Sequence, residues 1–135
     1  MVRKMLRAGV VAALGMVAVL ATYGVATSAN LADPDISEVM SKSFGKGGLK
    51  GKVSAAVKGG KWEDATKAAK EWNELGTALA KSKPPKGDEK VWEENCKKFS
   101  DSTKAILAGT EKKDAKATNT ALSSFKCMDC HKAHK

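Results

Sequence analysis

The chain has 135 residues and a formal net charge of +9, and only 5% of its residues are aromatic. This length predicts one domain, and the ordinary hydrophobic fraction of 42% excludes both a disordered chain and a chain embedded throughout in a membrane. A basic charge alone is compatible with nucleic-acid, membrane or acidic protein partners. Three cysteines cannot all be used in disulfides, so the remaining thiol needs an explanation.

Residues 1–29 have the pattern of a signal peptide for export. Three basic residues, the last at Arg7, precede an uncharged apolar run from Ala8 to Leu20, and small residues end the segment at Ala29. The alternative is a retained transmembrane anchor, because the apolar stretch can be extended to about 18 residues, near the lower limit for a membrane span. We expect cleavage, with localisation to the periplasm. A retained signal would tether the protein to the membrane instead.

Cleavage after residue 29 would leave a domain of 106 residues, 30–135. The signal carries three basic and no acidic residues, so the formal charge would fall from +9 to +6. A domain of this size has a modest hydrophobic core, to which an apolar cofactor would add.

The mature chain is predicted to be helical throughout. Good helix formers dominate, no segment alternates with period two, and proline occurs only at Pro34, Pro84 and Pro85. The first helix is expected to begin at Asp33-Pro34, with Asp33 as its N-cap. Glycines from Gly45 to Gly51 predict a break or kink in this helix, which should resume from about Leu49 to Val57.

Three further helices follow in chain order. The second carries an apolar stripe from Trp62 to Leu79 and is followed by a connection at 83–87 that includes both prolines. Asp88 is expected to cap the third helix, and Gly109 to end it. The fourth is predicted from about Glu111 through Phe125 into the cysteine motif. Short connections between such helices favour an all-α fold, an antiparallel up-down four-helix bundle.

Cys127-Met128-Asp129-Cys130-His131 has the pattern Cys-x-x-Cys-His, the attachment signature of c-type haem. On a helix, positions i, i+3 and i+4 share one face, so two thiols can form thioethers while the imidazole reaches the iron. The motif predicts one covalently attached haem c near the C-terminal end of the last helix.

Two other interpretations of the motif are weaker. A thioredoxin-like dithiol needs a βαβ context, whereas this pair closes an all-helical chain. A zinc site would use Cys127, Cys130, His131 and His134. Four ligands within eight residues of one helix would not readily surround a metal tetrahedrally.

A helical chain with this motif at its extreme C-terminus resembles the class II c-type cytochromes, the cytochromes c′ and their low-spin relatives. The resemblance covers the mature chain in architecture, but only the haem motif is specific. It implies that Cys127 and Cys130 hold the haem and that His131 is the proximal iron ligand. Low-spin members carry a methionine early in their first helix, a position that Met40 would match.

The second axial ligand decides the function. The mature chain has two methionines, and Met128 stands beside the attachment cysteines, where it cannot reach across the ring. In an up-down bundle the start of the first helix lies beside the end of the fourth, so Met40 is the expected ligand. The alternative is that Met40 only packs in the core. The glycine cluster departs from the family's continuous first helix and would be able to displace Met40.

These residues predict an exported monohaem cytochrome that carries single electrons through a haem with His/Met ligation. The alternative is a five-coordinate protein that binds nitric oxide or carbon monoxide. No activated nucleophile has a base near it, so we expect no enzymatic activity.

Several other residues have structural interpretations. Cys96 is expected to be a buried small hydrophobic residue, which explains the odd thiol. Trp62, Trp72 and Trp92 occupy core positions, and any of them would be able to pack on the porphyrin. His134 is expected to be a solvated residue of the C-terminal tail.

Five lysines are expected at the haem end of the bundle: Lys42, Lys46, Lys126, Lys132 and Lys135. They would form a basic rim that attracts an acidic redox partner, although a solvated face is the simpler interpretation. Nucleic acid is not an expected partner, because no basic stretch is interleaved with stacking aromatics. Class II proteins are often dimers, so a homodimer is compatible with the resemblance.

Overall fold

A computed structural model of the chain describes residues 35–135. The expected signal peptide and the pair Asp33-Pro34 lie outside the described residues. Those residues contain helices and no strand, as predicted. The helices are α1 (Ile36–Phe44), α2 (Leu49–Lys58), α3 (Trp62–Leu79), α4 (Glu89–Glu111), α5 (Ala115–Leu122) and α6 (Cys127–His134).

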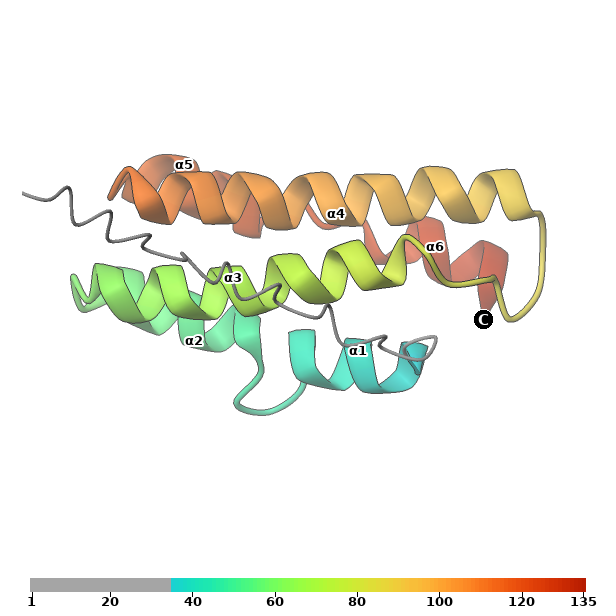
Figure 1. Cartoon of the computed structure of the whole chain (residues 1–135), viewed down its shortest axis with the longest axis horizontal. Coiled ribbons are helices and arrows are strands. Elements are labelled where there is room, and N and C mark those ends of the chain that lie inside the picture. The colour runs from blue at the N-terminus through green and yellow to red at the C-terminus, as the bar shows by residue number, and fades with distance from the viewer. Residues whose placement is uncertain (1–34) are drawn as a thin grey trace, which may run out of the picture.

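The helices pack together as a bundle around the two longest, α3 and α4, which lie side by side (Figure 1). Helix α2 packs on α3, and α5 packs on α4. Helices α1 and α6 contact α3 and α4, respectively, near the end of the bundle where α3 connects to α4 (Figure 1). None of the helices within residues 35–135 is long and apolar enough to cross a membrane.

Aspartates are the N-cap residues of three helices, α1, α4 and α5. Asp35 Oδ1 accepts a hydrogen bond from the Ser37 backbone N–H at 2.9 Å, and Asp88 Oδ1 accepts one from that of Val91 at 3.1 Å. Each bond satisfies a backbone donor that has no partner within its helix. The cap at Asp88 was predicted. The first helix instead begins at Ile36 with Asp35 as its cap, so the predicted start at Asp33 is wrong.

The predicted break in the first helix is confirmed. Helix α1 ends at Phe44 and α2 begins at Leu49, the residue expected from the sequence. Between them Gly47 has a φ of +73°, a left-handed conformation that glycine adopts without steric penalty. The first helix is therefore two helices, which meet at a turn.

Helix α4 continues past Gly109 to Glu111, so the predicted end at Gly109 is wrong. Gly109 is buried against α5, and a Cβ at this position would lie 2.5 Å from Thr118 Oγ1. The glycine therefore lets α4 and α5 approach closely instead of ending the helix. The turn that ends α4 comes at Lys113, which has a φ of +55°.

The predicted continuous fourth helix is also wrong, because it is divided into α5 and α6 with a break at residues 123–126. The Ser124 hydroxyl lies 2.7 Å from the Ala121 carbonyl oxygen and 2.9 Å from Ser102 Oγ on α4. Such side-chain hydrogen bonds compete with the helical pattern. Phe125 turns inward at the break and stacks on Trp72 with ring centroids 5.0 Å apart.

The core has two parts. The larger joins α2, α3, α4 and α5 around the fully buried Trp72 and Ile106. The smaller joins α1, α3 and α4 through Val39, Leu79 and Trp92. Trp72 and Trp92 are buried as predicted, whereas Trp62 is only partly buried at the edge of the larger part. The smaller part positions the candidate site.

Candidate functional site

A cavity of about 520 Å³ lies where α1, α3, α4 and α6 meet. Its wall includes all four residues that the sequence singled out: Met40, Cys127, Cys130 and His131. Most of the wall is apolar. Pockets of this size and character are typical of sites for small molecules and cofactors.

The two cysteines and the histidine come to the cavity on α6. This helix begins at Cys127, so Cys127, Cys130 and His131 stand at i, i+3 and i+4 on one helical face. Cys130 is half-buried, while Cys127 and His131 are exposed in the chain alone. Burial, with a smaller contribution from Cys127, raises the pKa of the Cys130 thiol above its ordinary value.

Met40 reaches the same cavity from α1. It is half-buried and packs against the smaller part of the core, which includes Val39 and Leu79. Met128, in contrast, is 59% exposed on α6 and does not line the cavity. Of the two methionines within residues 35–135, only Met40 lines the cavity, alongside His131.

Aromatic rings close one side of the cavity. Phe44, Phe99 and Phe125 line it, and their ring centroids are separated by 5.2 to 6.2 Å. Trp72 lies behind them, edge-on to Phe44 at 5.7 Å. Edge-to-face aromatic packing of this kind holds the rings in fixed orientations. None of the three phenylalanines was expected at the site from the sequence.

Cys96 also lines the cavity, from α4. Its side chain is 2% exposed, so its predicted burial is confirmed. Burial, with a smaller contribution from Cys130, raises the pKa of the Cys96 thiol to about 12. The side chain behaves as a small neutral residue at physiological pH.

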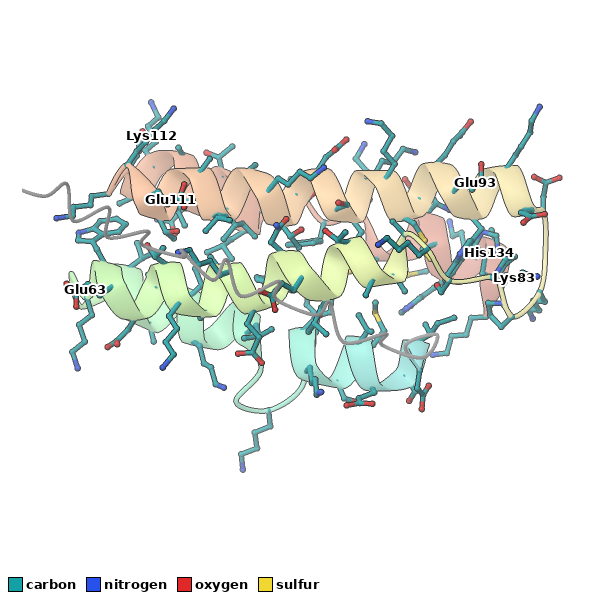
Figure 2. The ribbon with its side chains drawn as sticks, viewed as in Figure 1. Glu63, Lys83, Glu93, Glu111, Lys112 and His134 are labelled. Atoms are coloured by element: carbon teal, nitrogen blue, oxygen red, sulfur yellow. The ribbon has the colours of Figure 1, made fainter. Side chains whose placement is uncertain are left out.

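His134 is not a solvated tail residue, and that prediction is wrong. It is 4% exposed, its Nδ1 lies 2.8 Å from the Lys86 carbonyl oxygen, and its ring packs edge-on against Trp92 at 5.1 Å. Figure 2 shows His134 near Lys83, which belongs to the connection between α3 and α4. A helical spacing of four from Cys130 was the signal that could have placed His134 on the buried face.

The two weaker interpretations of the motif gain no support from this geometry. Within residues 35–135 no group of three or more histidine, cysteine, aspartate or glutamate side chains is arranged to hold a metal ion. His134 faces the Lys86 carbonyl oxygen instead of the cysteines. A thioredoxin-like dithiol needs a βαβ context, whereas residues 35–135 contain helices and no strand.

Five polar side chains from outside α6 also line the cavity, and we call them its polar edge. Asn95, Lys98 and Ser102 line it from α4, and Ser124 and Lys126 line it from the segment between α5 and α6. The Asn95 side-chain Nδ2 is buried and has no hydrogen-bond partner in the described part of the chain. Asn95 and Lys98 were not expected at the site, because neither belongs to a motif.

The five lysines of the expected rim do not share one environment. Lys126 lines the cavity, and Lys132 and Lys135 are exposed on or beside α6. Lys42 forms an ion pair with Glu38 on α1, which offsets its charge and raises its pKa. Lys126 and Lys98 both line the cavity, and neither forms an ion pair with a carboxylate of residues 35–135. Lys98 was not among the predicted lysines.

No family model, curated protein or solved structure matches the chain. The chemistry of the cavity and of its lining residues is therefore the basis for assigning a function.

Proposed function

We propose that this chain is an exported monohaem c-type cytochrome that carries single electrons and has no enzymatic activity. One observation carries the proposal: a single apolar cavity is lined by both cysteines and the histidine of a Cys-x-x-Cys-His motif and by a methionine from another helix. Cys127 and Cys130 would hold haem c through thioethers, and His131 and Met40 would be its axial ligands.

The residues present fit a haem. An apolar, aromatic-lined cavity suits the body of a porphyrin, and the unpaired Asn95 amide suits a polar edge. The motif residues share one face of α6, as attachment of two thioethers and ligation by an imidazole require. Haem supplies the one-electron chemistry when bound, and the protein tunes the potential through burial and axial ligation.

The protein's own residues have distinct parts in this proposal. Met40 and His131 would approach from α1 and α6, and the thioether of Met40 would raise the reduction potential. Phe44, Phe99 and Phe125 would exclude water from one side. An up-down order of the bundle, with α1–α2 and α5–α6 as its first and last members, would account for the proximity of α1 and α6.

Export and docking complete the proposal. Residues 1–29 would direct the chain to the periplasm, where free cysteines are at risk of oxidation and attachment to haem consumes two of them. Lys98, Lys126 and Lys132 would attract an acidic redox partner to the cavity end. A homodimer remains compatible with this arrangement, and nucleic acid is not proposed as a partner.

The second candidate function is binding of nitric oxide or carbon monoxide by a five-coordinate iron. It is favoured by the packing of Met40 against Val39 and Leu79, because a methionine held in the core would be unable to reach the iron. The two candidates differ in whether a sixth ligand must be displaced before a gas can bind.

Two measurements on the exported, purified protein test these proposals. Haem absorbance that persists after denaturation and organic extraction would support covalent attachment, and its loss would exclude a c-type cytochrome. The reduced protein is then exposed to carbon monoxide while its visible spectrum is recorded. An unchanged spectrum supports ligation by Met40, whereas rapid and complete formation of an adduct supports the gas-binding candidate.

A further inference from the structure

The wall of the cavity combines apolar and polar residues. Phe44, Leu79 and Phe99 contribute apolar surface. The polar residues come from two segments that are distant in sequence. Ser102 on α4 and Ser124 after α5 are joined by a hydrogen bond of 2.9 Å between their hydroxyls. An occupant with an apolar body and polar groups would match this wall.

Asn95 contributes a hydrogen-bond donor to the polar edge. Its Nδ2 is buried and has no hydrogen-bond partner in residues 35–135. A buried donor without an acceptor loses its hydrogen bond to water and gains none, so such groups are rare in folded proteins. Because Asn95 lines the cavity, an acceptor on the occupant would remove this penalty.

Two lysines stand along the same edge. Lys98 lies one helical turn after Asn95 on α4, and Lys126 comes from the break between α5 and α6. Both are exposed, and no ion pair ties either of them to a carboxylate within the described residues. Two cations and one amide donor therefore face a cavity whose other contacts are mainly apolar.

We infer that this edge is the subsite for the two haem carboxylates, with Asn95 and Lys98 of α4 and Lys126 as the groups that bind them. The inference rests on the proposed function and deepens it. Charge-assisted hydrogen bonds from lysines to carboxylates are stronger than neutral ones, and the Asn95 amide gains its missing acceptor. The carboxylates thereby determine which edge of the ring faces α4.

The other ionisable side chains along the cavity are consistent with this orientation. They are Asp129 and His131 on α6 and the three cysteine thiols. From α1 and α3 the lining residues are uncharged. Asp129 repels a carboxylate, so the carboxylates should lie nearer to Lys98 on α4 than to the Asp129 side chain on α6.

The first test is zero-length cross-linking of the protein with its haem attached. A carbodiimide activates a carboxylate, and a lysine amine in contact with it then forms an amide while the reagent leaves as a urea. Mass spectrometry of the digested protein should recover Lys98 joined to the haem-bearing peptide. Fragmentation distinguishes an amide to haem from an amide to Asp129.

Lys98→Gln should abolish the product that joins the α4 peptide to haem, and the matched control Lys104→Gln should leave that product unchanged. Lys104 is exposed on the same helix and does not line the cavity. If haem is attached and Lys104 is joined to it as readily as Lys98, or only Asp129 is joined to Lys98, the inference is overturned.

A second test uses resonance Raman bands of the haem carboxylate side chains, which report their hydrogen bonding. Asn95→Leu and Lys126→Gln should shift these bands, whereas Asn119→Leu on the exposed side of α5 should not. Identical bands in all four proteins, with haem attached, would contradict the inference and leave the proposed function intact. Absence of attached haem from the wild-type protein would overturn both.

Discussion

At the residue scale, Met40 and Cys96 are the two sulfur-bearing side chains that line the cavity from outside the motif. They differ in what burial does to them. Met40 is half-buried and carries a neutral thioether that can ligate iron without losing a proton. The Cys96 thiol would first have to ionise, and burial raises its pKa to about 12. This difference favours Met40 as the sulfur ligand.

Met40→Ala should convert a protein that does not respond to carbon monoxide into one that binds it rapidly, because the sixth position on iron would lose its ligand. The visible spectrum of the reduced protein measures this. Met128→Ala is the matched control, since Met128 is 59% exposed and does not line the cavity. Equal carbon monoxide binding by wild type and both variants would contradict ligation by Met40.

The free thiol of Cys96 should react very slowly with iodoacetamide at pH 8. Its pKa of about 12, against an ordinary 9.0, leaves about a thousandfold less thiolate than an exposed cysteine would have. Alkylation followed by mass spectrometry of the protein with haem attached gives the rate, with denatured protein as the reference. Rapid alkylation of the native protein would show that Cys96 is accessible.

The same pKa shift predicts how stability changes in alkali. Below pH 9 the Cys96 thiol is protonated in both the folded and the unfolded states. Between pH 9 and 12 the unfolded state loses the proton first, so the free energy of unfolding should fall as the pH rises. Urea unfolding of wild type and Cys96→Ala should show a smaller decline in the variant, and identical pH profiles would contradict the shift.

At the element scale, α6 depends on contacts made far away in the sequence. The break at residues 123–126 separates α6 from α5. The C-terminal end of α6 packs on the connection between α3 and α4, where His134 contacts Lys86. Gly87 makes this packing possible, because it has a φ of +88° and a Cβ there would lie 2.6 Å from the Ala133 carbonyl oxygen. The connection thereby holds the helix that carries the motif.

Gly87→Ala should destabilise the protein more than Gly60→Ala. Both glycines have positive φ, which strains any L-residue by about 1–2 kcal/mol, but only Gly87 also has α6 within contact of an added Cβ. Urea unfolding of the two variants gives the comparison. Equal losses of stability would show that α6 does not pack tightly on this connection.

At the scale of the whole molecule, the two parts of the core divide the bundle along its length. The larger part, around Trp72 and Ile106, involves α2, α3, α4 and α5 and reaches the cavity only through the phenylalanines at its margin. The smaller part borders the cavity and includes Met40 and Cys130 at its margin. A cofactor would therefore stabilise one end of the bundle much more than the other.

Preventing haem attachment by Cys127→Ala combined with Cys130→Ala should loosen α1 and α6 selectively. Amide hydrogen exchange should accelerate in these helices, while the amides of α3 and α4 that surround Ile106 keep their protection. Acceleration spread evenly over all helices would contradict a division into two parts. Unchanged exchange everywhere would indicate that the cavity end is stable without an occupant.

Much of this protein was predictable from its sequence, because the relevant forces act between neighbours in the chain. The stripe from Trp62 to Leu79, the cap at Asp88 and the glycine break before Leu49 are local signals, and the structure confirms each of them. The spacing of Cys127, Cys130 and His131 places them on one face of any helix. The tertiary structure decided what local signals do not contain. Ser124 in the break after α5 bonds to Ser102 on α4, His134 packs beside Gly87, and the polar edge combines Asn95 of α4 with Lys126 before α6. Each of these pairs is at least 22 positions apart in the sequence, so only the packing of the helices brings them to one place.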